Sequence, residues 1–284
     1  MIEPPIVSPG QLADAYALLA ESSHRPIAGG TDVLVQLTAG IGAPPDRLLD
    51  LWRLDELRGI SLDSDALSFG ALTTYSAIRR SSVCRELLPA LVEAAATIGA
   101  AQIQNRGTLG GNIANASPAG DMLPVLLATD ATIVVGSVRG ERVIPAADFW
   151  TGYRQTGLAP DELVVRVRIP LVADRQVRFR KIGTRRAQAI SKVVLALSWV
   201  SPALDAPWHT VRLGLGSVAE RPIRASATEA VLEGQPPTSD SADRAFVTLA
   251  AEIKPIDDVR STAEYRRAVA ARVLHRLIRD AGGW

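Results

Sequence analysis

Two segments of the chain combine adjacent glycines with hydroxyl, amide and carboxylate side chains. The first reads Ala-Gly-Gly-Thr-Asp-Val-Leu-Val-Gln over residues 28–36 and continues from a short strand predicted at residues 25–28. Adjacent glycines let the backbone turn with positive φ and leave its amides unobstructed, a geometry that binds phosphate oxygens. The same pair is also typical of an ordinary turn. The segment matches neither the Gly-x-Gly-x-x-Gly dinucleotide fingerprint nor the phosphate loop that ends in Gly-Lys-Ser/Thr.

The second segment, residues 106–121, is richer in such groups. It contains four glycines, two asparagines, Thr108, Ser117 and a final Asp121. A ligand with a diphosphate and a ribose needs close backbone approach and several side-chain hydrogen bonds, so we interpret this segment as a ligand-binding loop. Asp121 could accept hydrogen bonds from ribose hydroxyls. It could equally cap a helix predicted over residues 122–128, and the spacing does not decide between the two roles.

Composition excludes several other kinds of site. The 284 residues include one cysteine, Cys84, which cannot form an intramolecular disulfide, a thiolate zinc site or an iron–sulfur cluster with about four cysteine ligands. The three histidines are scattered, so we expect no metal site. A formal net charge of +1 provides no overall field for nucleic acid. No apolar stretch approaches the roughly 20 residues of a membrane span and no signal peptide is visible, so we expect a cytoplasmic protein.

One stretch is strongly basic although the total charge is balanced. No carboxylate interrupts it between residues 175 and 192. A solvated face, a contact with an anionic cofactor and a surface for an acidic partner are all compatible with this pattern. The cations are Arg175, Arg178, Arg180, Lys181, Arg185, Arg186 and Lys192.

The elements that would position these groups fall into two parts, and Pro170 marks the boundary that we favour. Apolar periodicity predicts helices and strands in the first part and a polar loop over residues 102–121. In the second part it predicts three strands, expected to be antiparallel, and then helices. The predicted helices are 11–21, 89–101, 122–128 and 262–280, and the predicted strands are 25–28, 48–51, 67–70, 132–136, 163–170, 177–180, 193–200 and 211–216, with a further strand that leads into a short turn over 143–149.

With both glycine segments in order, the chain resembles the FAD-binding medium subunit of molybdenum hydroxylases, the xanthine dehydrogenase and carbon monoxide dehydrogenase family. Residues 28–36 and 108–121 carry the resemblance. Similar motifs recur nearly to the end of the chain. The first loop reads Gly-Gly-Thr-Asp where carbon monoxide dehydrogenases tend to have Gly-Gly-His-Ser, which favours the xanthine dehydrogenase-like branch. The supporting motifs are at 57–60, 70–75, 98–108, 144–149 and 256–267.

The resemblance implies an α+β fold in two domains. A two-part FAD-binding α/β domain of the PCMH type would cover residues 1–174, with subdomains at about 1–55 and 56–174. A smaller domain of antiparallel sheet and helices would cover residues 175–284. The flavin is expected between the two domains.

The resemblance also implies where FAD binds. The first loop would wrap the diphosphate through its backbone amides, the second loop would complete this cradle, and Asp121 would reach the ribose. Val164 matches a flavin-contacting position, and Lys181 matches a lysine whose charge favours the anionic reduced flavin. We expect no catalytic acid, base or nucleophile. The cradle residues implied are Ala28, Gly29, Gly30, Thr31, Asp32, Val33, Leu34, Thr108, Gly111 and Asn112, with Asn115 nearby.

The function implied is that of an electron-transfer oxidoreductase subunit. It would take electrons from the [2Fe-2S] clusters of a small subunit, serve a large molybdopterin subunit that oxidises the substrate, and pass the electrons to NAD⁺ or another acceptor. A dimer of heterotrimers is the expected assembly. Because Cys84 is the only cysteine, the clusters must lie in another chain. A stand-alone flavin oxidoreductase and a non-redox nucleotide-binding scaffold subunit stay open as alternatives.

Overall fold

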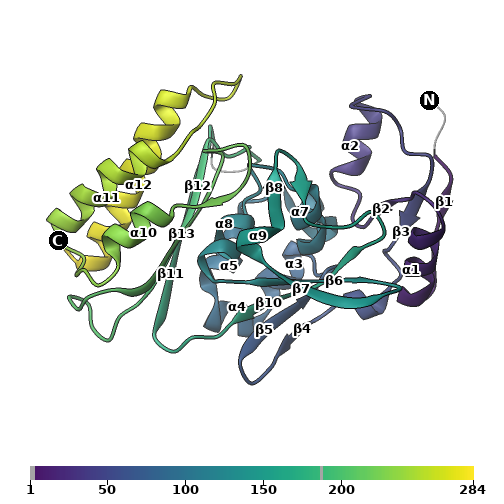
Figure 1. The fold of residues 1–284 in the computed structure, drawn as a ribbon, viewed down its shortest axis with the longest axis horizontal. Coiled ribbons are helices and arrows are strands. Elements are labelled where there is room, and N and C mark those ends of the chain that lie inside the picture. The colour runs from purple at the N-terminus through teal and green to yellow at the C-terminus, as the bar shows by residue number, and fades with distance from the viewer. Residues whose placement is uncertain (1–3, 186–187) are drawn as a thin grey trace.

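The computed structural model describes residues 4–185 and 188–284. Three parts follow one another along the longest axis of the molecule, and the two ends of the chain lie at opposite ends of it (Figure 1). They are an N-terminal subdomain, a central subdomain and a C-terminal domain.

The N-terminal subdomain is a small parallel sheet with one helix packed on it. The strand order is β1-β3-β2, and α1 buries Ala15 and Leu19, four residues apart, in a core with Leu49. Helix α2 follows β2 and projects from this part of the molecule (Figure 1). The elements are β1 (Ile6–Val7), α1 (Leu12–Glu21), β2 (Arg25–Ile27), α2 (Val33–Thr38) and β3 (Leu48–Asp50).

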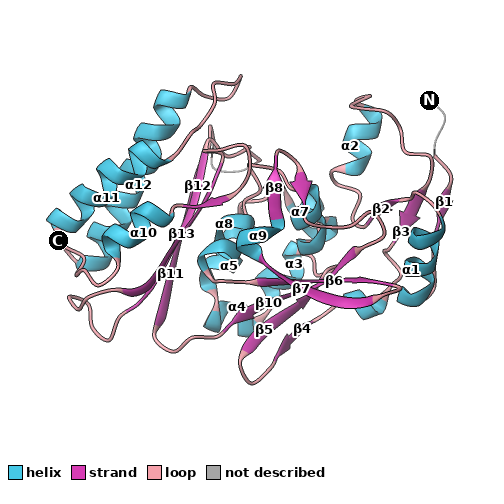
Figure 2. Cartoon of the chain, viewed as in Figure 1, coloured by secondary structure: helices cyan, strands magenta, loops and turns pink. Residues whose placement is uncertain are grey.

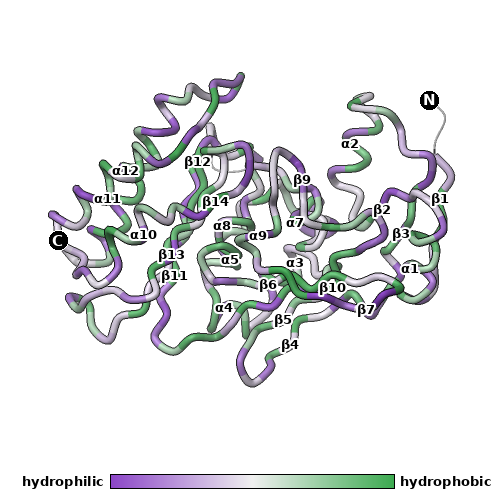
Figure 3. The backbone as a smooth tube through the Cα atoms, viewed as in Figure 1, coloured by the Kyte–Doolittle hydropathy of each residue, from purple (hydrophilic) through white to green (hydrophobic). Residues whose placement is uncertain are grey.

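The central subdomain is built on a five-stranded antiparallel sheet of order β4-β5-β10-β6-β7. Several of its helices lie between this sheet and the sheet of the C-terminal domain (Figure 2). Strand β6 is one of the most hydrophobic stretches of the chain, as its interior position requires (Figure 3). The strands are β4 (Ile60–Leu62), β5 (Ala66–Gly70), β6 (Thr132–Ser137), β7 (Gly140–Pro145), β10 (Leu163–Pro170) and the hairpin β8 (Trp150–Gly152) and β9 (Gln155–Thr156). The helices are η1 (Asp55–Leu57), α3 (Tyr75–Arg80), α4 (Ser82–Leu87), α5 (Pro89–Ala96), α6 (Ala101–Arg106), α7 (Leu109–Asn115), α8 (Leu123–Ala128) and α9 (Ala146–Phe149).

The C-terminal domain is a four-stranded antiparallel sheet, β11-β12-β13-β14, with helices on one face. Strand β12 is apolar on both faces because both are covered. Val194 and Ala196 belong to the core shared with the central helices, whereas Leu195 and Leu197 belong to the core under the C-terminal helices. The elements are β11 (Arg175–Ile182), β12 (Val193–Val200), β13 (His209–Gly216), β14 (Ile223–Arg224), α10 (Ser226–Leu232), α11 (Ser239–Glu252) and α12 (Ala263–Gly282).

Helix α8 joins the two domains by packing directly on β13. At Gly214 a Cβ atom would lie 2.2 Å from the carbonyl oxygen of Pro124, so only a glycine allows the helix backbone to come this close. Ser198 on β12 donates a hydrogen bond to the carbonyl oxygen of Ala128 at the other end of the helix.

The α+β fold class and the antiparallel pairing of the C-terminal sheet are confirmed, and the strands over 163–170 and 193–200 coincide with β10 and β12. The C-terminal sheet has a fourth strand, β14, beyond the three predicted, because this two-residue strand is too short to leave an apolar pattern. The polar loop over 102–121 is wrong, because residues 102–106 belong to α6 and residues 109–115 form α7. Thr108 caps α7 by accepting a hydrogen bond from the Gly111 amide at 3.0 Å, and Leu109 and Ile113 are buried four residues apart. The predicted helix over 89–101 ends earlier, at Ala96.

Candidate cofactor-binding site

Two adjoining cavities run from the N-terminal subdomain to the domain interface. The first, of about 320 Å³, lies among the loop after β2, α7 and the start of β10. The second, of about 790 Å³, lies between the central subdomain and the C-terminal domain. Because the two cavities share part of their lining, they adjoin and together form one groove. The shared residues are Thr31, Asp32, Tyr75, Asn112 and Asn115.

The first glycine loop connects β2 to α2 and passes directly against the turn between α6 and α7. A Cβ atom on Gly29 would lie 1.8 Å from the carbonyl oxygen of Arg106, and Gly30 has a φ of 76°. Both positions therefore require glycine, Gly29 for close approach and Gly30 for backbone conformation. The loop amides of residues 29–33 donate to no acceptor in the described part of the chain. A run of adjacent unpaired amides is suited to binding an anion.

The second glycine segment presents a different chemistry. The amides of Gly111 and Asn112 are already used, since they donate to the side chain and the carbonyl oxygen of Thr108 at 3.0 Å each. The Oδ1 atom of Asn112, by contrast, is buried without a hydrogen-bond partner among the described residues. A buried acceptor of this kind costs about 1–3 kcal/mol when it is left unpaired. A ligand donor in the groove would satisfy it.

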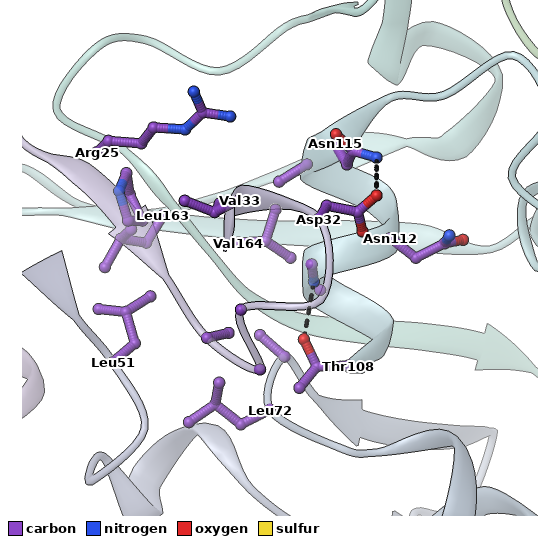
Figure 4. Close-up of a pocket in the computed structure, with 18 of the residues that line it drawn as sticks. Arg25, Asp32, Val33, Leu51, Leu72, Thr108, Asn112, Asn115, Leu163 and Val164 are labelled. Carbon is purple, nitrogen blue, oxygen red and sulfur yellow. Dashed lines mark hydrogen bonds between the residues drawn. The ribbon is translucent and has the colours of Figure 1, made fainter. Parts of the chain in front are cut away.

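A chain of hydrogen bonds crosses the groove where the two cavities meet. Asn115 donates to Asp32 Oδ1 at 3.0 Å and accepts from Arg154 Nη1 at 3.0 Å, and Figure 4 shows the first of these contacts. Asp32 reaches solvent, but the protein around the groove raises its pKa by desolvation, against the opposing effects of Arg154 and Asn115. The ionised form of Asp32 is therefore stabilised by a cation from the β8–β9 hairpin, Arg154.

A buried ion pair lines the second cavity and spans the domain interface. Lys181 on β11 donates to Asp121 Oδ2 at 2.5 Å and to the carbonyl oxygen of Thr97 at 3.0 Å. Ser191 donates to the other carboxylate oxygen. Burial raises the pKa of Asp121, and the charge and hydrogen bond of Lys181 oppose this shift. The capping role considered for Asp121 is wrong: Met122 occupies the N-cap of α8 and makes no side-chain cap.

Trp52 connects the N-terminal subdomain to the α6–α7 turn through a contact with Arg106. The guanidinium carbon of Arg106 lies 3.7 Å from the Trp52 ring centroid, and that of Arg58 lies 4.6 Å from it. These are cation–π distances. The carbonyl of Arg106 is the group that abuts Gly29, so the stacked tryptophan also steadies the wall of the first glycine loop.

Most of the residues expected at the site line the groove (Figure 4). Leu34 does not: it lies on α2 with 51% of its surface exposed, and its amide donates to the carbonyl oxygen of Gly30. The residues in the first cavity are Ala28, Gly29, Gly30, Thr31, Asp32, Val33, Thr108, Gly111, Asn112, Asn115 and Val164, and those in the second include Asp121 and Lys181.

Sequence reasoning missed several lining residues. Tyr75 lies in the motif at 70–75 and could have been found there; burial raises its pKa well above the usual range, whereas the neighbouring Asn112 lowers it. Arg25 and Arg154 carry no comparable signal, because an arginine beside a strand or in a short turn is usually a surface residue. Both line the groove.

The basic stretch does not form a single solvated face. Its side chains separate into different contacts: Arg175 lies 3.8 Å from Asp130, Arg180 lies 3.3 Å from Glu93, and Lys181 is the residue at the groove. Arg178 stacks near the Trp199 ring, at 5.6 Å. Arg186 is outside the described residues.

Two protein families account for nearly the whole chain. Residues 2–172 match the family described as the FAD binding domain in molybdopterin dehydrogenase, and residues 178–281 match the CO dehydrogenase flavoprotein C-terminal domain. The chain belongs to the FAD-binding medium subunits of molybdenum hydroxylases. It is thus a flavoprotein subunit of a molybdenum-containing oxidoreductase, with FAD as cofactor, as the glycine loops predict.

Relatives from both branches of this family are similar over most of their length. The glyceraldehyde dehydrogenase medium chain of Sulfolobus acidocaldarius is 32% identical over 253 residues, which cover 89% of this chain and 88% of that protein. The carbon monoxide dehydrogenase medium chain of Afipia carboxidovorans is 32% identical, with 96% and 94% covered. The xanthine dehydrogenase FAD-binding subunit of Escherichia coli O157:H7 is also 32% identical, with 96% and 95% covered. These identities do not separate the branches.

Solved structures of the family have the same fold. The carbon monoxide dehydrogenase from Hydrogenophaga pseudoflava that lacks the Mo-pyranopterin moiety superposes with a TM-score of 0.92 at 30% identity, over 97% of this chain and 96% of that one. Quinoline 2-oxidoreductase from Pseudomonas putida 86 gives 0.91 at 28% identity, over 100% and 99%. No helix in the described ranges of this medium subunit is both long and apolar enough to span a bilayer.

Proposed function

We propose that this medium subunit binds FAD along the groove and carries electrons from the [2Fe-2S] clusters of a small subunit to NAD⁺ or another acceptor. A large molybdopterin subunit would oxidise the substrate, and two such heterotrimers would assemble as a dimer. When bound, FAD would supply the redox chemistry, taking up two electrons and releasing them to the acceptor.

The observation that carries this proposal is the continuity of the groove. A dinucleotide needs a diphosphate site between two flatter pockets, and the two cavities here meet at the first glycine loop. The amides of residues 29–33 are the donors offered there, and Gly29 lets the loop that carries them lie directly against the backbone of Arg106. Ala28, Val33 and Val164 supply apolar wall in the first cavity.

Lys181 has the role of an electrostatic neighbour of the flavin ring. Its ammonium group lines the second cavity and is fixed by Asp121 and the carbonyl oxygen of Thr97. A fixed cation stabilises negative charge that develops nearby, and the carboxylate partner limits how strongly it does so. Asp121 would thus limit the electrostatic effect of Lys181 on the flavin, and it would also face the ribityl or ribose hydroxyls.

The cysteine content is consistent with the proposed partner subunits. With one cysteine the chain cannot hold an iron–sulfur cluster, so the [2Fe-2S] clusters of this proposal would lie in the small subunit. The medium-chain relatives named above belong to multi-subunit dehydrogenases, which supports the same assembly here.

The test is to purify the chain alone, load it with FAD and follow absorbance at about 450 nm without oxygen. We expect no bleaching by candidate organic substrates and rapid bleaching by the dithionite-reduced small iron–sulfur subunit, followed by recovery on addition of NAD⁺ or another acceptor. Direct bleaching by an organic substrate would indicate a stand-alone oxidoreductase. A chain that takes up no FAD would indicate a scaffold subunit.

A further inference from the structure

The β8–β9 hairpin is an anchored arm at the edge of the groove. Trp150 at its base is 1% exposed, donates from Nε1 to the carbonyl oxygen of Ile113 at 3.1 Å and accepts from Arg221 Nη1 at 2.7 Å. Gly152 pairs with Gln155, so the turn consists of Tyr153 and Arg154. The base of the hairpin is thus tied to both α7 and the C-terminal domain, which fixes the position of the turn.

Turn geometry does not explain why an arginine stands at position 154. Its φ is 53°, in the left-handed region. Glycine and asparagine are the residues favoured at turn positions with positive φ, and other L residues are disfavoured there. A residue held in such a conformation at the edge of a binding groove commonly has a functional reason to be there.

The contacts of Arg154 supply such a reason. Its Nη1 atom donates to Asn115 Oδ1, and Asn115 donates from its other amide atom to Asp32 Oδ1, so the cation is linked to the carboxylate through one side chain. Asp32 lies in the run of unpaired amides of the first glycine loop. A diphosphate bound by those amides would place its two negative charges close to the negative charge of Asp32.

Ligand binding would make this repulsion stronger. In the open groove water screens Asp32, but a dinucleotide that fills the groove displaces that water, and the interaction between charges grows as the local dielectric falls. The neutralising cation therefore matters most in the bound state. A cation that Asn115 holds near Asp32 would have little effect on the fold and a large effect on the affinity for an anionic ligand.

We propose that Arg154 is a positioning residue whose positive charge, held near Asp32 by Asn115, offsets the charge of Asp32 and thereby allows the first glycine loop to accept a diphosphate. This inference rests on the proposed binding of FAD in the groove.

The experiment measures FAD affinity by quenching of flavin fluorescence, together with Tm, for the full chain. The variants are Arg154→Gly, Arg154→Gln, Asp32→Asn and the double variant Arg154→Gly/Asp32→Asn. Arg272→Gln is the matched control, because Arg272 is an exposed arginine on α12 that lines neither cavity.

Arg154→Gly should leave Tm unchanged or raise it, since glycine suits the positive φ, and should weaken FAD binding by about tenfold or more, the size expected for one charge-assisted contact. Arg154→Gln should weaken binding similarly while it keeps a side chain at the turn. In the double variant the removal of the carboxylate should restore most of the affinity. Arg272→Gln should bind FAD like the wild type.

Unchanged affinity in both Arg154 variants would overturn the inference. So would a double variant that binds no better than Arg154→Gly, because Arg154 would then act on the ligand without Asp32. If the wild-type chain itself binds no FAD, the proposed function fails instead, and the two failures are distinguishable.

Discussion

Replacing Gly29 by alanine tests the phosphate cradle most directly. The new Cβ atom would lie 1.8 Å from the carbonyl oxygen of Arg106, whereas ordinary contact begins at 3.4 Å, so the shortfall is 1.6 Å. All three atoms nearest to the new Cβ belong to the backbone of Arg106 and Gly107 and cannot rotate away. The first glycine loop and the α6–α7 turn must therefore separate by a distance comparable to the shortfall.

A displacement of this size would remove the alignment of the loop amides with a bound diphosphate. Each hydrogen bond to a charged group contributes about 1.5–3 kcal/mol, so the loss of one weakens FAD binding by roughly tenfold to a hundredfold. Overpacking of the loop adds a stability cost of about 1–3 kcal/mol. We thus expect a folded Gly29→Ala variant with a lowered Tm and a clearly weaker affinity for FAD.

The assay is titration of the apoprotein with FAD, read by quenching of flavin fluorescence, with urea unfolding in parallel. Gly10→Ala is the matched control, because a Cβ atom at Gly10 meets nothing within 4 Å. Equal FAD affinity in Gly29→Ala, Gly10→Ala and the wild type would refute the cradle argument. A loss of affinity in Gly10→Ala as well would show that the assay reports general damage.

Three further predictions concern contacts at or next to the groove. Lys181→Met leaves Asp121 buried without its cation and should lower the free energy of unfolding by about 3 kcal/mol, with recovery on adding Asp121→Asn; no loss in urea unfolding would contradict the buried pair. Trp52→Leu removes stacking on two arginines and should lower the free energy of unfolding by about 1–2 kcal/mol. An unchanged urea midpoint would show that this stacking does not contribute to stability. A hydrogen bond from Arg142 holds the pKa of Glu162 below its usual 4.5. This stabilisation is present above about pH 4.5 and is lost as the pH falls through the folded-state pKa, so Glu162→Gln should flatten the acid limb of the stability curve, and an unchanged limb would argue against the pair.

The sequence best predicts the strands whose residue pattern follows directly from which of their faces are buried. Strand β10 alternates and ends at Pro170, and β12 is an unbroken apolar run because both of its faces are covered. Helix α7 was missed because its two glycines and two asparagines favour turns locally, and α6 was missed because its sequence is mostly polar. Capping by Thr108 and burial of Leu109 overcome that preference, and burial depends on the tertiary fold.

At the candidate site, the sequence predicts the glycine loops better than it predicts contacts between residues far apart in the chain. Glycine pairs mark the first loop because backbone geometry is written into local residue types. The pairing of Asp121 with Lys181 joins positions 60 residues apart, and no periodicity reports such a contact. Arg154 escapes prediction for the same reason, since its contact with Asn115 spans 39 residues.

Helix α8 belongs to the first domain by sequence but contributes to the packing of both. The close approach of Pro124 to Gly214 and the shared burial of Val194 mean that neither half would keep a complete core if the chain were cut between them. The medium subunit should consequently unfold as one cooperative unit, with a single calorimetric transition, although two evolutionary modules compose it.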